Sequence, residues 1–222
     1  MTNLIFDYDG TIHNCMKIYK PSFLKACEYL EENHKIEKKS YTDEQISYWL
    51  GFSGDDMWRM FQPNLEQEWR EKGRKIIGQE MAKHLDNGDA SLFDGAENVL
   101  AELKSKGYTL MFLSNCREAY QQRHTKNFGL DRFFDYFYCA ETYDFIPKYE
   151  IFRRFIKNSH EGDFIVIGDR FHDIETAVKN NLKSVGCAYG YGNPEELKNA
   201  DIIIDDISEL PQAVEKLESG HQ

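Results

Sequence analysis

The chain has 222 residues and a formal net charge of −11, with 29% charged and 41% hydrophobic residues. This balance is typical of a soluble globular protein and excludes an intrinsically disordered one. The excess of acid argues against nucleic acid or an anionic membrane as a binding partner, since both are bound through basic patches.

No feature of the sequence indicates export or membrane insertion. No stretch approaches the roughly 20 apolar residues that span a bilayer, and residues 1–7 lack the basic segment that opens a secretory signal. The five cysteines are scattered without a C-x-x-C pair, so neither a zinc site nor a disulfide framework is indicated. We expect a reduced, cytoplasmic setting and no obligate protein partner.

Short apolar runs that are typical of buried strands recur along the chain, starting with residues 4–6. Amphipathic helical patterns separate the later runs. Strands that are apolar throughout and alternate with helices predict a parallel sheet covered on both faces, so we expect an α/β fold with a Rossmann-like sheet. The later expected strands are residues 110–113, 136–139, 164–167, 185–187 and 202–204, and the helical patterns cover residues 96–103, 120–128, 151–156 and 174–178.

Two helices near the end of the chain have starts that can be read from the sequence. Asn193 precedes Pro194, which combines a capping side chain with proline at the first helical position. Ser208 precedes Glu209-Leu210-Pro211 in a similar pattern. We therefore expect helices to begin directly after Asn193 and Ser208.

The stretch from about Asn14 to Ala90 differs from the rest, because it contains helical patterns and no convincing strand. Thr42 and Gln45 form a capping box for one of these helices. A helical block inserted after the first strand predicts a second, smaller domain above the edge of the sheet. The expected helices are residues 23–30, 43–50, 55–61 and 65–85, and the expected domains are a core of residues 1–13 and 90–222 and a helical domain of residues 14–89.

The first strand runs directly into Asp7-Tyr8-Asp9-Gly10-Thr11. Two carboxylates spaced two residues apart on an extended segment project to the same side. Gly10 allows a tight turn that presents backbone amides to a ligand. Because two neighbouring acids repel each other, the arrangement costs stability unless a metal ion or a shared proton relieves it.

Three further segments place polar groups at strand ends or helix starts. Ser114 and Asn115 follow the second strand and could hydrogen-bond a phosphoryl oxygen. Asp169 and Asp173 follow the strand of residues 164–167, and Lys148 lies before that strand. Taken singly, each of these has an ordinary structural explanation as a helix cap, a first-turn acid or a solvated lysine.

Together the four segments, in this order, resemble the four motifs of the haloacid dehalogenase superfamily of phosphotransferases. The resemblance covers nearly the whole chain, and the helical insert resembles the helical-cap subgroup of phosphoglycolate phosphatase-like enzymes. The chain departs from the family pattern in two places. The segment around Lys148 is shortened, and His13-Asn14 replaces the usual Asp-Ser after the first motif, which leaves the role of His13 open.

The resemblance implies a role for each motif residue. Asp7 would be the nucleophile, and Asp9 would act as general acid and base, which requires its pKa to lie above the ordinary value. Mg²⁺ would bind Asp7, the backbone carbonyl of Asp9 and Asp169, while Asp173 would orient bound water or Lys148. Lys148 would also act in catalysis by holding the phosphoryl group. The expected phosphate-binding residues are Gly10, Thr11, Ser114, Asn115 and Lys148.

The function that the resemblance implies is Mg²⁺-dependent hydrolysis of a small phosphorylated metabolite through an aspartyl-phosphate. Asp9 argues against a dehalogenase, because a halide leaves without protonation. A sugar-phosphate mutase of the same superfamily stays open, as does a non-enzymatic phospho-receiver or binding protein. Thr11 favours a phosphatase over the mutase, in which Val is common at this position. The separation of Asp7 from Asp9 by Tyr8 speaks against the receiver, whose two acids are adjacent.

The substrate is not determined by the sequence. Phosphoglycolate, a nucleoside monophosphate, a sugar phosphate and pyrophosphate all remain open. In the helical domain, Phe52, Ser53 and Gly54 belong to a glycine-flanked loop at residues 51–56. This loop either reaches into the cleft and selects the leaving group or simply connects two helices.

Overall fold

The computed structural model describes residues 2–220, and the chain divides into two compact units. The first unit comprises Met1–Asn14 and Leu92–Gln222, and the second comprises Cys15–Ser91. Across the described residues, no helix combines the length and the apolar character that crossing a bilayer requires.

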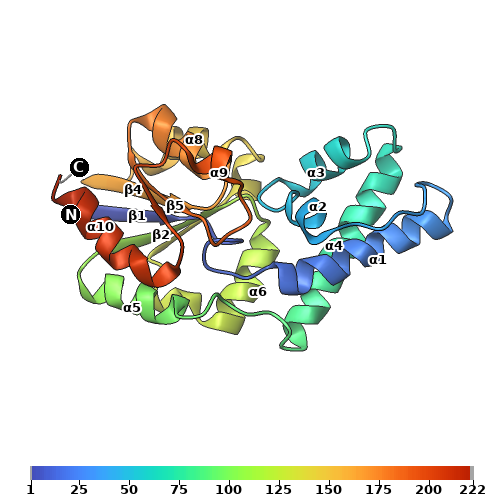
Figure 1. Ribbon diagram of the computed structural model, residues 1–222, viewed down its shortest axis with the longest axis horizontal. Helices are drawn as coiled ribbons and strands as arrows, with labels where there is room; N and C mark the ends of the chain where they lie inside the picture. Colours follow the sequence, from blue (N-terminus) through green and yellow to red (C-terminus); the bar gives the residue numbers. More distant parts are fainter. Residues whose placement is uncertain (1, 221–222) are drawn as a thin grey trace. The chain divides into compact units, whose positions relative to one another are not determined.

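A six-stranded parallel sheet forms the centre of the first unit, with the strand order β3-β2-β1-β4-β5-β6 (Figure 1). Phe6 at the end of the central strand lies opposite Phe112 on one side and Ile167 on the other. This architecture confirms the expected α/β fold. The strands are β1 (Thr2–Phe6), β2 (Thr109–Ser114), β3 (Tyr136–Cys139), β4 (Asp163–Gly168), β5 (Lys183–Cys187) and β6 (Ile202–Ile204).

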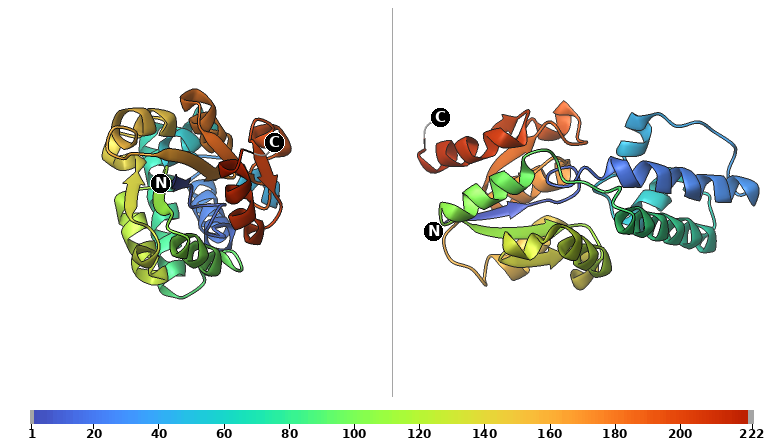
Figure 2. Two further views of the ribbon diagram at one scale, coloured as in Figure 1. Left: turned by 90° about the vertical axis from the view of Figure 1, so that its left-hand side faces the viewer. Right: turned by 90° about the horizontal axis from the view of Figure 1, so that it is seen from below.

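Helices cover both faces of this sheet (Figure 2). They are α5 (Ala96–Ser105), α6 (Glu118–Phe128), α7 (Lys148–Ile151), the π-helix η3 (Phe152–Ile156), α8 (Phe171–Asn180), α9 (Pro194–Leu197) and α10 (Leu210–Glu218), with 3₁₀ turns η1 (Leu130–Arg132), η2 (Ala140–Tyr143) and η4 (Ile207–Glu209). Side chains alternate between the faces of a strand, so Leu4 and Phe6 share a hydrophobic core with α5 and α10, whereas Ile5 shares one with α7 and η3. Burial on both faces explains why the strands are continuously apolar.

The two late helix starts differ in how well the sequence predicts them. Asn193 accepts a hydrogen bond from the backbone of Glu196 and α9 begins at Pro194, as expected. The expectation for Ser208 is wrong, because this residue lies inside η4 and donates its backbone N–H and its hydroxyl to Asp206. A carboxylate two residues earlier therefore caps the turn, and α10 begins only at Leu210.

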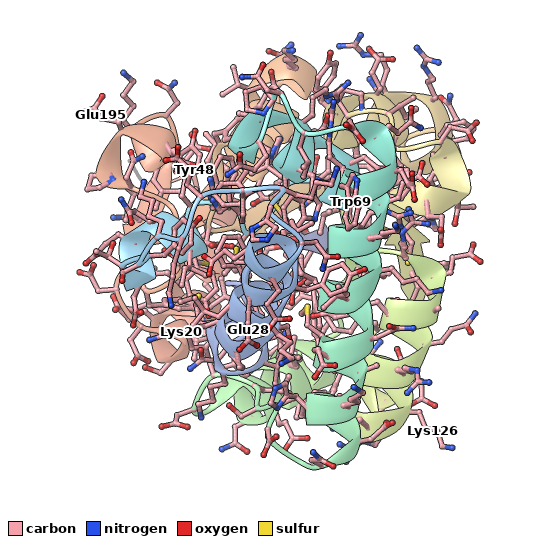
Figure 3. The ribbon with its side chains drawn as sticks, turned by 90° about the vertical axis from the view of Figure 1, so that its right-hand side faces the viewer. Lys20, Glu28, Tyr48, Trp69, Lys126 and Glu195 are labelled. Carbon is pink, nitrogen blue, oxygen red and sulfur yellow. The ribbon has the colours of Figure 1, made fainter. Side chains whose placement is uncertain are left out.

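The second unit consists of helices α1 (Met16–Glu32), α2 (Asp43–Ser47), α3 (Gly54–Phe61) and α4 (Gln67–Asp86). The two long helices α1 and α4 pack side by side, and Figure 3 labels Lys20 and Glu28 on α1 and Trp69 near the start of α4. The predicted capping box of Thr42 and Gln45 is present. The helix it caps ends at Ser47, before the predicted end at residue 50, because the next backbone hydrogen bonds tighten to an i→i−3 pattern.

Two glycines of α4 offer a matched test of packing in this unit. A Cβ at Gly73 would overlap the ring of Trp58, whereas a Cβ at Gly78 would meet nothing within 4 Å. We expect Gly73→Ala to lower the free energy of unfolding by about 1–3 kcal/mol through overpacking. Gly78→Ala should raise it by about 0.5–1 kcal/mol, because alanine favours the helix. Urea unfolding followed by circular dichroism measures both, and equal stabilities of the two variants would contradict this packing.

Candidate active site

Four of the residues predicted from the sequence meet at the carboxyl ends of β1 and β4. Asp7 follows β1 and Asp169 follows β4, while Lys148 opens α7 and Asp173 lies in the first turn of α8. None of the four is more than 4% exposed. Nζ of Lys148 lies 2.8 Å from Oδ1 of Asp7 and 2.7 Å from Oδ1 of Asp173. One oxygen from each of the three aspartates lies within 4.8 Å of the others.

The carboxylate of Asp169 is held in place by backbone and side chain alike. The hydroxyl of Thr11 donates to its Oδ1 over 3.0 Å, and the backbone N–H of Tyr191 donates to its Oδ2 over 2.8 Å. Gly10 has φ +93°, and a Cβ there would overlap this carboxylate. A Cβ at Gly192 would likewise overlap the backbone oxygen of Asp169. The predicted Gly10 and Thr11 therefore both lie directly against the carboxylate of Asp169.

Asp173 joins a helix start to the lysine. Its Oδ2 accepts a hydrogen bond from the backbone N–H of Arg170 over 3.1 Å, which caps α8. Its Oδ1 accepts one from Lys148. The buried guanidinium of Arg170 in turn pairs with Glu196 at 2.9 Å. Asp173 thus orients Lys148 and is itself fixed by the helix it caps.

The cluster carries three carboxylates against one ammonium group, all shielded from water. Burial, together with the charge of Asp173, raises the pKa of Asp7 to about 7, although Lys148 opposes this shift. Burial and the charges of Asp7 and Asp173 also raise the pKa of Asp169 well above its usual value. Burial alone would lower the pKa of Lys148, but Asp173 and Asp7 outweigh it and raise that pKa, which keeps the lysine cationic.

Asp9 lies outside this cluster of carboxylates and has partners of its own. Its Oδ1 contacts Nδ1 of His13 at 2.7 Å and accepts from the hydroxyl of Tyr120 at 2.6 Å. The role of general acid led us to expect a pKa of Asp9 above its ordinary value. Burial does act in that direction, but the hydrogen bond from His13 and further interactions with it, His124 and Tyr120 lower the pKa below its usual value. The expected direction is therefore wrong.

The other predicted site residues lie in two places. Ser114 is buried at the end of β2, the strand beside β1, and Asn115 follows it half-buried. In the second unit, Ser53 caps α3 by accepting from the backbone of Asp56, and Gly54 is the first residue of that helix. The ring of Phe52 packs near Tyr48 and Trp49. The structure thus gives Ser53 a local role as a helix cap.

Two groups of residues around the site were not predicted as functional. Tyr191 and Gly192 enclose Asp169, and their only signal in the sequence is the glycine- and tyrosine-rich run at residues 186–192. Tyr120 and His124 belong to the surroundings of Asp9, and their signal is the helical spacing of residues 120, 124 and 128. Tyr191 lies 22 residues from Asp169 along the chain, and Tyr120 lies 111 residues from Asp9.

The raised pKa of Asp7 predicts how stability depends on pH in EDTA. A carboxyl whose pKa is raised in the folded state binds its proton more tightly there, so protonation stabilises the folded protein. This contribution to the free energy of unfolding is fully present below about pH 4 and is lost as the pH rises through about 7. Between pH 5 and 7, the free energy of unfolding should fall more steeply for the wild type than for Asp7→Asn. The two slopes should differ by at most about 1.4 kcal/mol per pH unit. Urea unfolding across this range measures both slopes, and equal slopes would contradict the shift.

Comparison with known proteins places these residues in a family. The family model for haloacid dehalogenase-like hydrolases matches residues 4–187. Pyrophosphatase PpaX of Listeria innocua is 26% identical over 216 residues, covering 95% of this chain and 94% of that protein. Phosphoglycolate phosphatase of Vibrio parahaemolyticus is 21% identical over 223 residues, covering 95% of each. A 5′-nucleotidase of Pseudomonas aeruginosa is 30% identical, but that match spans 48% of this chain and 50% of the relative.

Solved structures share the fold of the whole chain. The crystal structure of a predicted phosphatase from Clostridium acetobutylicum superposes with a TM-score of 0.79 at 22% identity, covering 97% of this chain and 98% of that one. A predicted phosphoglycolate phosphatase from Haemophilus somnus gives a TM-score of 0.75 at 21% identity, covering 96% and 97%. The resemblance drawn from the four motifs is thereby confirmed. The chain belongs to the haloacid dehalogenase-like hydrolase family and is a hydrolase with the fold of that family's phosphatases.

Proposed function

We propose that this chain is a Mg²⁺-dependent phosphomonoester hydrolase that acts on a small phosphorylated metabolite through a phosphoryl intermediate on Asp7. The observation that carries the proposal is the buried contact of Lys148 with Asp7 and Asp173 beside Asp169. A nucleophilic carboxylate, a fixed cation and two further acids are the groups that phosphoryl transfer through a carboxylate requires.

The carboxylates of this cluster suit Mg²⁺. Their oxygens are the hard ligands that the ion prefers, and their combined charge exceeds that of Lys148. Asp7, Asp169 and the backbone carbonyl of Asp9 would hold the ion, with Asp173 acting through water. When bound, Mg²⁺ supplies positive charge that offsets the charge of the phosphoryl oxygens.

In the first half-reaction, a carboxylate oxygen of Asp7 attacks phosphorus while the bond from phosphorus to the leaving oxygen breaks. Lys148 stays cationic between its two aspartates and attracts the phosphoryl oxygens, with the hydroxyl of Ser114 as a hydrogen-bond donor. Asp9 gives its proton to the leaving oxygen, which departs as an alcohol. A bound phosphate dianion would raise the pKa of Asp9 by charge repulsion, in the direction opposite to the effect of His13 and Tyr120.

In the second half-reaction, water attacks the phosphorus of the intermediate. Asp9, now a carboxylate, takes a proton from that water, and the bond from Asp7 to phosphorus breaks. The products are inorganic phosphate and the free carboxylate of Asp7, so the cycle can repeat. Repeated turnover separates this function from that of a phospho-receiver, which would be phosphorylated once.

The names of the relatives narrow the substrates that merit testing. PpaX is named for pyrophosphate, and the other relatives for phosphoglycolate and for nucleotides. We propose a small phosphate ester, and the assignment of Phe52, Ser53 and Gly54 to its selection stays a prediction. A panel of candidate substrates for this test should contain phosphoglycolate, pyrophosphate, nucleoside 5′-monophosphates and sugar phosphates.

Replacement of the nucleophile tests the proposal. Asp7→Asn should lower kcat with Mg²⁺ by at least about 10³-fold, because an amide cannot attack phosphorus. Phosphate release from 4-nitrophenyl phosphate and from the panel measures kcat, and circular dichroism checks the fold. Asp206→Asn is the matched control, since it makes the same chemical change at an exposed cap and should keep wild-type activity.

Three results would contradict the proposal. Wild-type kcat in Asp7→Asn would exclude Asp7 as the nucleophile. A single stoichiometric phosphorylation of the wild type, without release of phosphate, would indicate a receiver. Movement of phosphate within a sugar, without its release, would indicate a mutase.

A further inference from the structure

Two donors converge on one oxygen of Asp9. Nδ1 of His13 lies 2.7 Å from Oδ1, and the hydroxyl of Tyr120 lies 2.6 Å from the same atom. The hydroxyl and Nδ1 of His13 are 3.2 Å apart, so the three groups form a closed triangle. Both of these contacts are made by Oδ1, and the carboxylate side chain is 20% exposed. Oδ2 is therefore the oxygen that can carry a proton.

The imidazole of His13 is held rigidly by its neighbours. It is completely buried and stacks on Tyr8 with ring centroids 5.2 Å apart and planes inclined by 13°. The edge of His124 approaches it at 4.7 Å, and Phe128 lies 6.1 Å away. Nε2 of His13 meets no hydrogen-bond partner within residues 2–220. The tautomer with its proton on Nδ1 is therefore favoured, because that N–H can donate to Asp9. A proton on Nε2 would leave a buried N–H group without an acceptor, which costs free energy.

Tyr120 is fixed from the other side of the same cluster. It lies on α6, and its ring contacts that of His124 at 4.0 Å. Nδ1 of His124 is in turn 2.9 Å from the hydroxyl of Tyr8. Each donor to Asp9 thus belongs to a packed aromatic cluster, and neither ring can turn without losing contacts there.

We propose that His13 and Tyr120 are positioning residues for Asp9, which fix its rotamer through Oδ1 and aim Oδ2 at the leaving oxygen. The inference rests on the proposed function, since it assigns partners to the acid of that reaction. The proton on Oδ2 moves to the leaving oxygen as the phosphorus–oxygen bond breaks, and Oδ2 later takes a proton from the attacking water. A carboxyl displaced by about 1 Å can lose on the order of 10² in rate.

The test compares two leaving groups. The nitrophenolate of 4-nitrophenyl phosphate departs without protonation, whereas the alkoxide of an alkyl phosphate needs the proton of Asp9. The value of kcat/KM reports the first half-reaction for each substrate. His13→Phe keeps a ring in the stack and removes the donor. We expect its kcat/KM to fall about 10- to 100-fold for an alkyl phosphate that the wild type turns over, and less than about 3-fold for 4-nitrophenyl phosphate.

Three further variants separate positioning from a structural effect. His13→Asn places an amide N–H near the site of Nδ1 and should restore most of the alkyl-phosphate activity. Tyr120→Phe removes the second donor and should show a smaller loss of the same selective kind. Tyr138→Phe is the matched control, because it deletes a tyrosine–histidine hydrogen bond, to His160, at β3 and should leave both substrates unaffected.

Defined outcomes would overturn the inference. Equal losses for the two substrates in His13→Phe and Tyr120→Phe would show a structural role, and unchanged values for both would show no role. If His13→Phe does not fold by circular dichroism, Tyr120→Phe and His13→Asn decide the matter. A wild-type protein that turns over neither substrate would contradict the proposed function itself.

Discussion

The ion pairs of buried Lys148 with Asp7 and Asp173 are the interactions on which the site depends. Desolvating these charges costs free energy that the ion pairs offset only in part, since Asp169 adds a third carboxylate without a second lysine. The raised pKa values of Asp7 and Asp169 express this imbalance. An arrangement that costs stability and favours a cation is what we expect of the proposed phosphoryl-transfer site.

The fold brings these charged groups close together. Because β1 and β4 are parallel neighbours, the carboxyl ends that carry Asp7 and Asp169 lie side by side. The capping interaction of Asp173 at the start of α8 brings its other oxygen to Lys148. Asp9, one residue beyond Tyr8, instead contacts His13 and Tyr120. The two acids of the first motif therefore sit in different electrostatic environments although they are close in sequence.

Sequence patterns predict well those features that local chemistry decides. The continuous apolar runs gave all six strands, and the Thr42 and Asn193 caps appear as expected. The contact of Asp9 with Tyr120 was out of reach, because Tyr120 lies 111 residues away. His13 lies only four residues from Asp9, but the sequence left its role open. The predicted direction of the pKa shift of Asp9 was wrong for the same reason. Its nearest partners are a histidine and a tyrosine from the aromatic cluster, and no local pattern reports that contact.

The binding of Mg²⁺ tests most directly whether the excess of buried carboxylates forms a cation site. Isothermal titration calorimetry of EDTA-stripped protein should show one Mg²⁺ bound per chain in the wild type. Asp169→Asn, which keeps the shape of the side chain, should bind it at least about tenfold more weakly. Absence of Mg²⁺ binding to the wild type, or equal affinity in Asp169→Asn, would contradict the account.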